Sequence, residues 1–187
     1  APDITSSFNK NINWYFGTDG NTPDSLYDFV TVVLHEIAHG LGFTGFFYIS
    51  NNLGTYAFNE IGEASAFDLL VVKNSNNQLV DTTIFPLPSL ELKNALTSAS
   101  LYANSPSATK NGIKPRLYAP TTFNDGSSIY HLNDATYPND LMTHAIGKAE
   151  AVHDPGPLVS GIIADLGWKH MFITLDKPKD MEQAKPI

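Results

Sequence analysis

The chain has no cysteine among its 187 residues. Disulfide bonds, cysteine-ligated metal sites and cysteine nucleophiles are therefore excluded together. Positive charge is scarce, since 11 Lys and Arg residues stand against 19 Asp and Glu residues, for a formal net charge of -8. Because a phosphate backbone demands a basic footprint, we expect no nucleic-acid partner. No apolar run approaches the roughly 18 residues that a membrane helix needs, so we expect no membrane segment.

The composition is otherwise that of an ordinary globular protein, with 42% hydrophobic and 16% charged residues. This length fits one domain with a real core and a cleft. We assign that domain to residues 1–175. Residues 176–187 are polar and resemble a linker, which suggests additional domains in the full protein.

A helix is predicted over residues 26–41, where apolar residues recur at helical spacing. Asp24 or Ser25 would cap its N-terminus, and Asp28 would lie in the first turn. Two glycines at positions 40 and 42 indicate that the helix ends there.

The remaining segments have weaker patterns, and residues 102–140 lack helical periodicity, which predicts a long ordered loop. The other elements that we expect are short strands within Ile4–Phe16, a helix at Glu60–Leu70, a strand beginning within Leu69–Lys73, a helix at Pro88–Ala99, a last helix at Leu158–Leu166 and a strand at Met171–Leu175.

The first helix carries His35-Glu36-Ile37-Ala38-His39. Histidines four residues apart project from one helix face, where both imidazoles can bind one Zn²⁺. Glu36 lies near that face, where a general base would take a proton from a zinc-bound water. The alternative is a solvated polar face, but the flanking residues are apolar, and buried ionisable groups are costly unless paired or metal-bound. We therefore predict zinc at His35 and His39.

A catalytic zinc usually has three protein ligands. The compact metzincin pattern would place a third histidine at position 45, which is Gly45. A gluzincin-type enzyme would use a downstream carboxylate, for which Glu60 and Glu63 are candidates. However, thermolysin-like enzymes have an Asp four residues after that glutamate, and Ala64 occupies the position that corresponds to Glu60. The other source is a distant histidine, His131.

His131 belongs to a group of short motifs with a recognisable order. Gly-Ser-Ser-x-x-His ends at His131, Met142 follows eleven residues later, and Asp165-Leu166-Gly167-Trp168 closes the series. With the helix motif and its Gly-Leu-Gly-Phe continuation, these segments resemble the leishmanolysin-type, long-insertion metzincins. The resemblance covers roughly residues 3 to 168.

The resemblance implies His35, His39 and His131 as zinc ligands, Glu36 as general base and Met142 as the Met-turn residue. It also implies a metzincin-like α+β fold, with a small twisted sheet packed on the zinc helix and a loop-rich C-terminal subdomain with a final helix. The function would be a secreted zinc endopeptidase acting on protein or peptide substrates. Residues 132–146 would line the primed side of the cleft. Few residues precede the helix. The domain would therefore lack its first strands, either because the sheet is abbreviated or because a preceding N-terminal segment was removed or excluded.

Several other residues have weaker claims to a role. His144 could stabilise the transition state, because some metzincins place a tyrosine two residues after the methionine. Tyr130 and Tyr137 are further candidates of this kind. His153 fits a helix-start turn and His170 the surface. Asn124-Asp125 and Asn133-Asp134 could bind Ca²⁺, but turn chemistry explains both pairs. A rival of another class is a catalytically silent zinc-binding module. The intact Glu36 counts against it, because such a module needs no general base.

Overall fold

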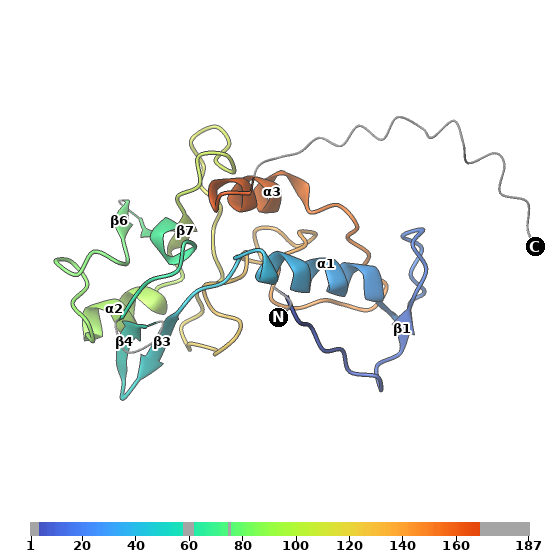
Figure 1. The fold of residues 1–187 in the computed structure, drawn as a ribbon, viewed down its shortest axis with the longest axis horizontal. Coiled ribbons are helices and arrows are strands. Elements are labelled where there is room, and N and C mark those ends of the chain that lie inside the picture. The colour runs from blue at the N-terminus through green and yellow to red at the C-terminus, as the bar shows by residue number, and fades with distance from the viewer. Residues whose placement is uncertain (1–3, 58–61, 75, 169–187) are drawn as a thin grey trace, which may run out of the picture.

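The computed structural model describes residues 4–57, 62–74 and 76–168, which form a mixed α and β fold (Figure 1). Its elements in chain order are β1 (Trp14–Tyr15), β2 (Tyr27–Asp28), α1 (Phe29–Gly40), β3 (Phe47–Ser50), β4 (Leu53–Tyr56), the 3₁₀ turn η2 (Asp68–Leu70), β5 (Val71–Lys73), β6 (Asn77–Gln78), α2 (Leu90–Leu96), β7 (Leu101–Ala103) and α3 (Gly156–Asp165). The α+β class expected from the sequence is confirmed.

Helix α1 starts later than predicted. Its N-cap is Asp28, whose side chain accepts a hydrogen bond from the backbone N–H of Thr31 at 2.7 Å. The predicted caps Asp24 and Ser25 were wrong, because Tyr27 and Asp28 are extended and pair with β1 as strand β2. The predicted end is confirmed, since α1 stops at Gly40 and Gly42 has a φ of 104° that favours glycine.

The strands form three small sheets among the described residues, where the sequence suggested a single one. β1 and β2 are parallel, β3 and β4 form an antiparallel hairpin, and β5 lies between β6 and β7. The hairpin turns at Asn51 and Asn52, which have φ values of 49° and 65°. Asparagine tolerates this left-handed conformation, and such turns match the twist of a hairpin. Within Ile4–Phe16, only β1 is formed.

The remaining helix predictions have mixed outcomes. The helix expected at Glu60–Leu70 is wrong over its described part, which contains only η2, and β5 follows directly. The helix at Pro88–Ala99 is confirmed but shorter, as α2 with Ser89 as its N-cap. The last helix is confirmed as α3 and begins at Gly156. The strand expected at Met171–Leu175 and the tail at 176–187 lie outside the described residues.

The segment between β7 and α3 has no helix or named strand, as predicted, yet it contributes to the core. One buried cluster extends from Ala38 in α1 to Ile162 in α3 and includes side chains of this irregular segment: Leu117, Ile129, Leu132 and Met142, all 0% exposed. Apolar burial thus fixes a segment that lacks regular hydrogen bonding. In the part of the chain that the structure describes, no helix is long and apolar enough to cross a membrane.

Candidate metal centre and active site

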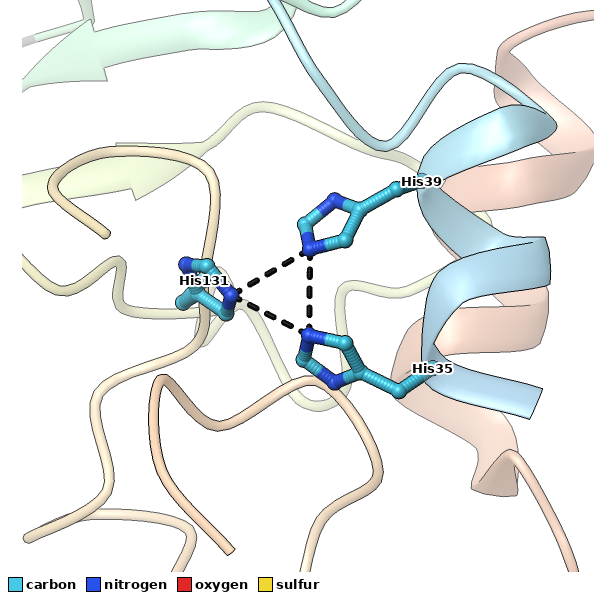
Figure 2. Close-up of side chains that lie close together, drawn as sticks. All are labelled: His35, His39 and His131. Carbon is cyan, nitrogen blue, oxygen red and sulfur yellow. Dashed lines mark hydrogen bonds between the residues drawn. The ribbon is translucent and has the colours of Figure 1, made fainter. Parts of the chain in front are cut away.

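Three histidines from two distant segments converge on one point (Figure 2). His35 and His39 project from α1, and His131 projects from the irregular segment opposite. The distances between their Nε2 atoms are 3.0 Å for His35 and His39, 3.2 Å for His35 and His131, and 3.3 Å for His39 and His131. The structure therefore brings together the three residues that the resemblance grouped.

These separations fit a tetrahedral metal site. Two imidazole nitrogens, each 2.0–2.1 Å from a tetrahedral zinc, lie about 3.3 Å apart. All three observed separations are within a few tenths of an ångström of that value. Among the described residues, His35, His39 and His131 are the group of His, Asp and Glu side chains whose ligand atoms lie close enough together to hold a metal ion.

Each histidine of the cluster uses its other ring nitrogen to donate to a backbone carbonyl. His35 Nδ1 donates to Leu141 O at 2.9 Å, His39 Nδ1 to Phe43 O at 2.8 Å and His131 Nδ1 to Ser127 O at 2.8 Å. A carbonyl oxygen only accepts, so each Nδ1 carries a proton, and each ring in its neutral form presents an Nε2 lone pair. Three lone pairs face one another without a donor between them, which is the arrangement that a metal cation satisfies.

Burial favours the neutral form of two of these rings. Loss of solvent lowers the pKa of His131 to about 3, and the same effect lowers the pKa of His35. His131 is only 4% exposed. Neutral imidazole is the form that binds a metal, so both residues are ready to act as ligands at neutral pH.

The position of His131 depends on a buried network at its neighbour Tyr130. The Tyr130 hydroxyl donates to Asp68 Oδ1 at 2.9 Å and accepts from Phe47 N at 2.5 Å. Asp68 also accepts from the backbone N–H of Phe46 and Ser65. These bonds fasten the segment of His131 to the chain that leaves α1. Burial raises the pKa of Asp68, although its hydrogen bonds act in the opposite direction.

Gly45 lies inside this network. A Cβ at position 45 would come within 2.1 Å of Asp68 Oδ1 and 2.6 Å of the Tyr130 ring. No side chain fits there without displacement of its neighbours. A compact metzincin has its third histidine at the position of Gly45. Here the absence of a side chain at Gly45 leaves room for the Asp68–Tyr130 hydrogen bond that positions the segment of His131.

The turn with Met142 contacts both parts of the histidine cluster through its backbone. The carbonyl of Leu141 accepts from His35, and the carbonyl of Met142 accepts from Leu132 N at 2.7 Å, directly after His131. The Met142 side chain is 0% exposed. The turn therefore orients His35 and fixes the segment of His131, whereas its role as a Met-turn under a metal stays a prediction.

Glu36 lines two cavities, each of which also has a histidine of the cluster in its wall. The first is lined by residues of α1, including His35, and by residues 140–146. The second is lined by His39, by the chain after α1 and by residues 123–130. Glu36 lines both cavities, so it lies beside the cluster where the two cavities adjoin the helix. Residues 140–146 line the first cavity, and the expected place of residues 132–146 on the primed side of a substrate cleft stays a prediction.

His144 lines the first cavity with Glu36. Its ring stacks on Tyr118, with centroids 3.9 Å apart, and its Nδ1 lies 3.5 Å from Asp134 Oδ1. This Nδ1 is buried and forms no hydrogen bond with the described residues. The ring is thus held in place by stacking, and its suggested role in the transition state stays a prediction.

The described part of the structure gives no direct support for a functional role of the remaining candidate residues. Glu63 is exposed and does not belong to the histidine cluster, and Glu60 and His170 lie outside the described residues. Tyr137 accepts from Arg116 N, so like Tyr130 it has a structural contact. Asn133 accepts from Thr136 N within a turn, as expected from turn chemistry.

His153 has a contact that the sequence did not indicate. Its Nε2 donates to Asp28 Oδ1 at 2.8 Å, so it supports the start of α1, 125 residues earlier in the chain. Asp28 also accepts from Thr22 and Thr31 and is 0% exposed. The sequence suggested only a place in the turn that starts the last helix, whereas the side chain of His153 bonds to the N-cap of α1.

Sequence reasoning missed Asp68. Its signal was present as a lone acid within the apolar run Ala66-Phe67-Asp68-Leu69-Leu70-Val71-Val72. A carboxylate in such a run is buried, and a buried carboxylate requires donors. The sequence could have shown that Asp68 has partners, but not that Tyr130, 62 residues away, is one of them.

The chain was also compared with known proteins. The family model described as SPBPB7E8-like matches residues 1–85, which is less than half of the chain. The match includes α1 with His35, Glu36 and His39, but it ends before His131. No curated protein and no solved structure matches. The likeness to leishmanolysin-type metzincins consequently stays a prediction.

Proposed function

We propose that this protein is a zinc-dependent endopeptidase with His35, His39 and His131 as ligands and Glu36 as general base. The observation that carries the proposal is the convergence of three Nε2 lone pairs while every Nδ1 is bonded to a carbonyl. With each Nδ1 protonated, the neutral rings have no hydrogen left for bonds between their Nε2 atoms, and a metal cation would satisfy all three lone pairs. Zinc would supply Lewis acidity there, lowering the pKa of a water and polarising the peptide carbonyl.

The chain's own residues would have separate roles in the reaction. The three carbonyls that accept from Nδ1 fix the ring orientations and increase the basicity of the ligand nitrogens. Glu36, which lines both cavities, would take the proton of the attacking water and deliver it to the leaving amine. Met142 fills the core behind the turn that holds His35, and we propose that it has the Met-turn role. A peptide would lie along the cleft formed by the two cavities beside Glu36.

The wider proposal includes a metzincin-like fold and secretion to an extracellular setting. Both rest on the leishmanolysin resemblance of the motifs around His35, His131 and Met142. The gluzincin alternative is less well supported, because the described candidate Glu63 is exposed and separate from the cluster. A silent zinc-binding module is also less well supported, because the acid lies in a cleft beside the cluster, where such a module has no need for it.

Zinc content and casein cleavage of purified variants test the proposal. Glu36→Ala should keep its zinc and lose about 10²–10⁴-fold in kcat, which is the usual contribution of a general base. His131→Ala should bind zinc more than ~100-fold more weakly and lose activity as well, because a ligand matters at least as much as the residues behind it. Matched controls are Glu91→Ala, on the exposed face of α2, and His144→Ala, which should keep full zinc occupancy.

The outcomes separate the alternatives. Full zinc occupancy and activity in His131→Ala would remove the third ligand from the proposal and favour a carboxylate. A zinc-loaded wild type that cleaves neither casein nor short peptides would favour the binding module. Loss of zinc in Glu36→Ala would show that the glutamate is needed for the metal and not only for the chemistry.

A further inference from the structure

The cavity beside His35 and Glu36 has the size of a single side chain. It lies between the first half of α1 and residues 140–150, and its volume is about 190 Å³. Pockets for drug-sized ligands usually measure about 300–1,000 Å³. A cavity of this size next to the histidine cluster suits one residue of a longer ligand that continues along the cleft.

The wall of this cavity has a strong bias of charge. Three carboxylates line it, from Glu36, Asp140 and Glu150, and no Lys or Arg side chain does. Neither Asp140 nor Glu150 forms an ion pair within the described residues, where the ion pairs are those of His144 and His153. The neighbouring cation, Lys148, lies instead over the ring of Tyr27, 5.9 Å from its centroid. The lining side chains therefore give the cavity a negative bias, which a zinc ion at His35 would offset only in part.

Apolar groups complete the lining. Val32, Ala145 and Ile146 contribute to the same wall as the carboxylates. An apolar wall with acids suits a side chain that has an aliphatic stem and a cationic end, which describes lysine and arginine. A leucine would leave the carboxylates without a partner, and a glutamate would be repelled by them.

We infer that this cavity binds the Lys or Arg side chain of a residue next to the bond that is cut, with Glu150 as the specificity-determining residue. The inference rests on the proposed peptidase function and adds the class of substrate to it.

Glu150 is preferred to the other two carboxylates for structural reasons. Glu36 has the proposed role of base. The Asp140 side chain accepts from Met142 N at 3.4 Å, so it supports the turn behind the histidine cluster, and burial raises its pKa. Glu150 has one oxygen that accepts from Gly147 N at 2.7 Å, a hydrogen bond that involves neither the histidine cluster nor the turn with Met142. Its charge can thus be removed without disturbance of the cluster.

A binding measurement tests the cavity without turnover. Titration of the full chain with n-pentylammonium and with pentan-1-ol, followed by the NMR shifts of Thr143, Ala145 and Ile146, compares a cationic with a neutral ligand of similar length. The wild type should bind the ammonium ion more tightly, and Glu150→Gln should reduce this advantage by roughly three- to tenfold. The glutamine keeps an oxygen for Gly147 N. Glu91→Gln, with the same change of charge on exposed α2, should have no effect.

Peptide cleavage gives the second readout. Peptides that differ at one position, with Lys, Leu or Glu next to the bond that is cut, should be preferred in that order, and Glu150→Lys should move the preference towards Glu. Equal binding of the ammonium ion and the alcohol, or an advantage unchanged in Glu150→Gln, would overturn the inference. Failure of the proposed function has a different signature, since cleavage would then be absent while the binding difference persists.

Discussion

Helix α1 and residues 127–146 of the irregular segment between β7 and α3 both contribute to the histidine cluster, but they position their residues by different means. In α1, the helical repeat alone places His35 and His39 on one face, one turn apart. In the irregular segment, backbone bonds from Tyr118 N to His131 O and from Leu132 N to Met142 O replace a regular element. The helix would keep its geometry in many surroundings, whereas the position of His131 depends on contacts from several parts of the chain.

Because of this difference, substitutions near α1 and substitutions near Tyr130 should affect the geometry of the histidine cluster differently. Loss of a contact at the start of α1 should weaken the helix but leave the spacing of His35 and His39 unchanged. Loss of a contact around Tyr130 changes the distance between His131 and the other two. We therefore expect zinc affinity and stability to respond separately on the two sides, and three substitutions examine this expectation.

The largest effect is expected for Asp68→Ala, which removes the anchor of the irregular segment. Phe46 N, Ser65 N and the Tyr130 hydroxyl would lose Asp68 as an acceptor, the first two in a part-buried place and the third in a buried one. Unsatisfied buried donors cost about 1–3 kcal/mol each, and relaxation reduces the sum, so we expect a loss of about 3–4 kcal/mol. Urea unfolding gives this value, and competition with a chromophoric chelator should show weaker zinc binding. Unchanged zinc affinity would mean that His131 is positioned without the Asp68 network.

An intermediate effect is expected for Asp28→Asn, at the start of α1. The buried carboxylate accepts from Thr22, Thr31 and His153, and an amide cannot accept at both ends. We expect a loss of about 2 kcal/mol with little change in zinc affinity, because the helical spacing persists. A large fall in zinc affinity would contradict the separation of the two sides.

The same variant has a pH signature. Burial raises the pKa of Asp28, but the hydrogen bonds from Thr22, Thr31 and His153 outweigh it, and the net shift is downward. The charged form therefore stabilises the fold above the unfolded pKa of about 3.9, and this contribution is lost as the pH falls through the lower folded value. The stability difference between wild type and Asp28→Asn should narrow below about pH 4, measured by urea unfolding across pH.

The smallest effect is expected for Gly45→Ala, at the junction between the two sides. The new methyl group would press on Asp68 and the Tyr130 ring. Overpacking of this kind costs about 1–2 kcal/mol when neighbours can shift. Thr44→Ala is the matched control, since Thr44 is exposed and should tolerate the change. Zinc affinity should fall in Gly45→Ala only, and equal behaviour of the two variants would show that the junction has room to adapt.

Much of the α1 side could be predicted from the sequence. The His35-Glu36-x-x-His39 spacing, the apolar flanks and the glycine stop define a helix with two imidazoles and an acid, because helix geometry is a local property. The cap was misplaced by a few residues, since the pairing of Tyr27 with Trp14 decides where the helix begins. The helix expected at Glu60–Leu70 failed over its described part for a related reason. Asp68 is engaged in long-range hydrogen bonds, which outweigh local periodicity.

The sequence by itself determined the chemistry available to this protein: no cysteine, a pair of histidines one helical turn apart, an acid beside them and a short list of third partners. Only the tertiary structure decided which partner lies within 3.3 Å of the pair, and which carbonyls turn the three lone pairs towards one point. The reason is physical. Helical spacing is set by neighbours along the chain, whereas the approach of His131 across more than ninety residues is set by burial and by bonds between distant segments.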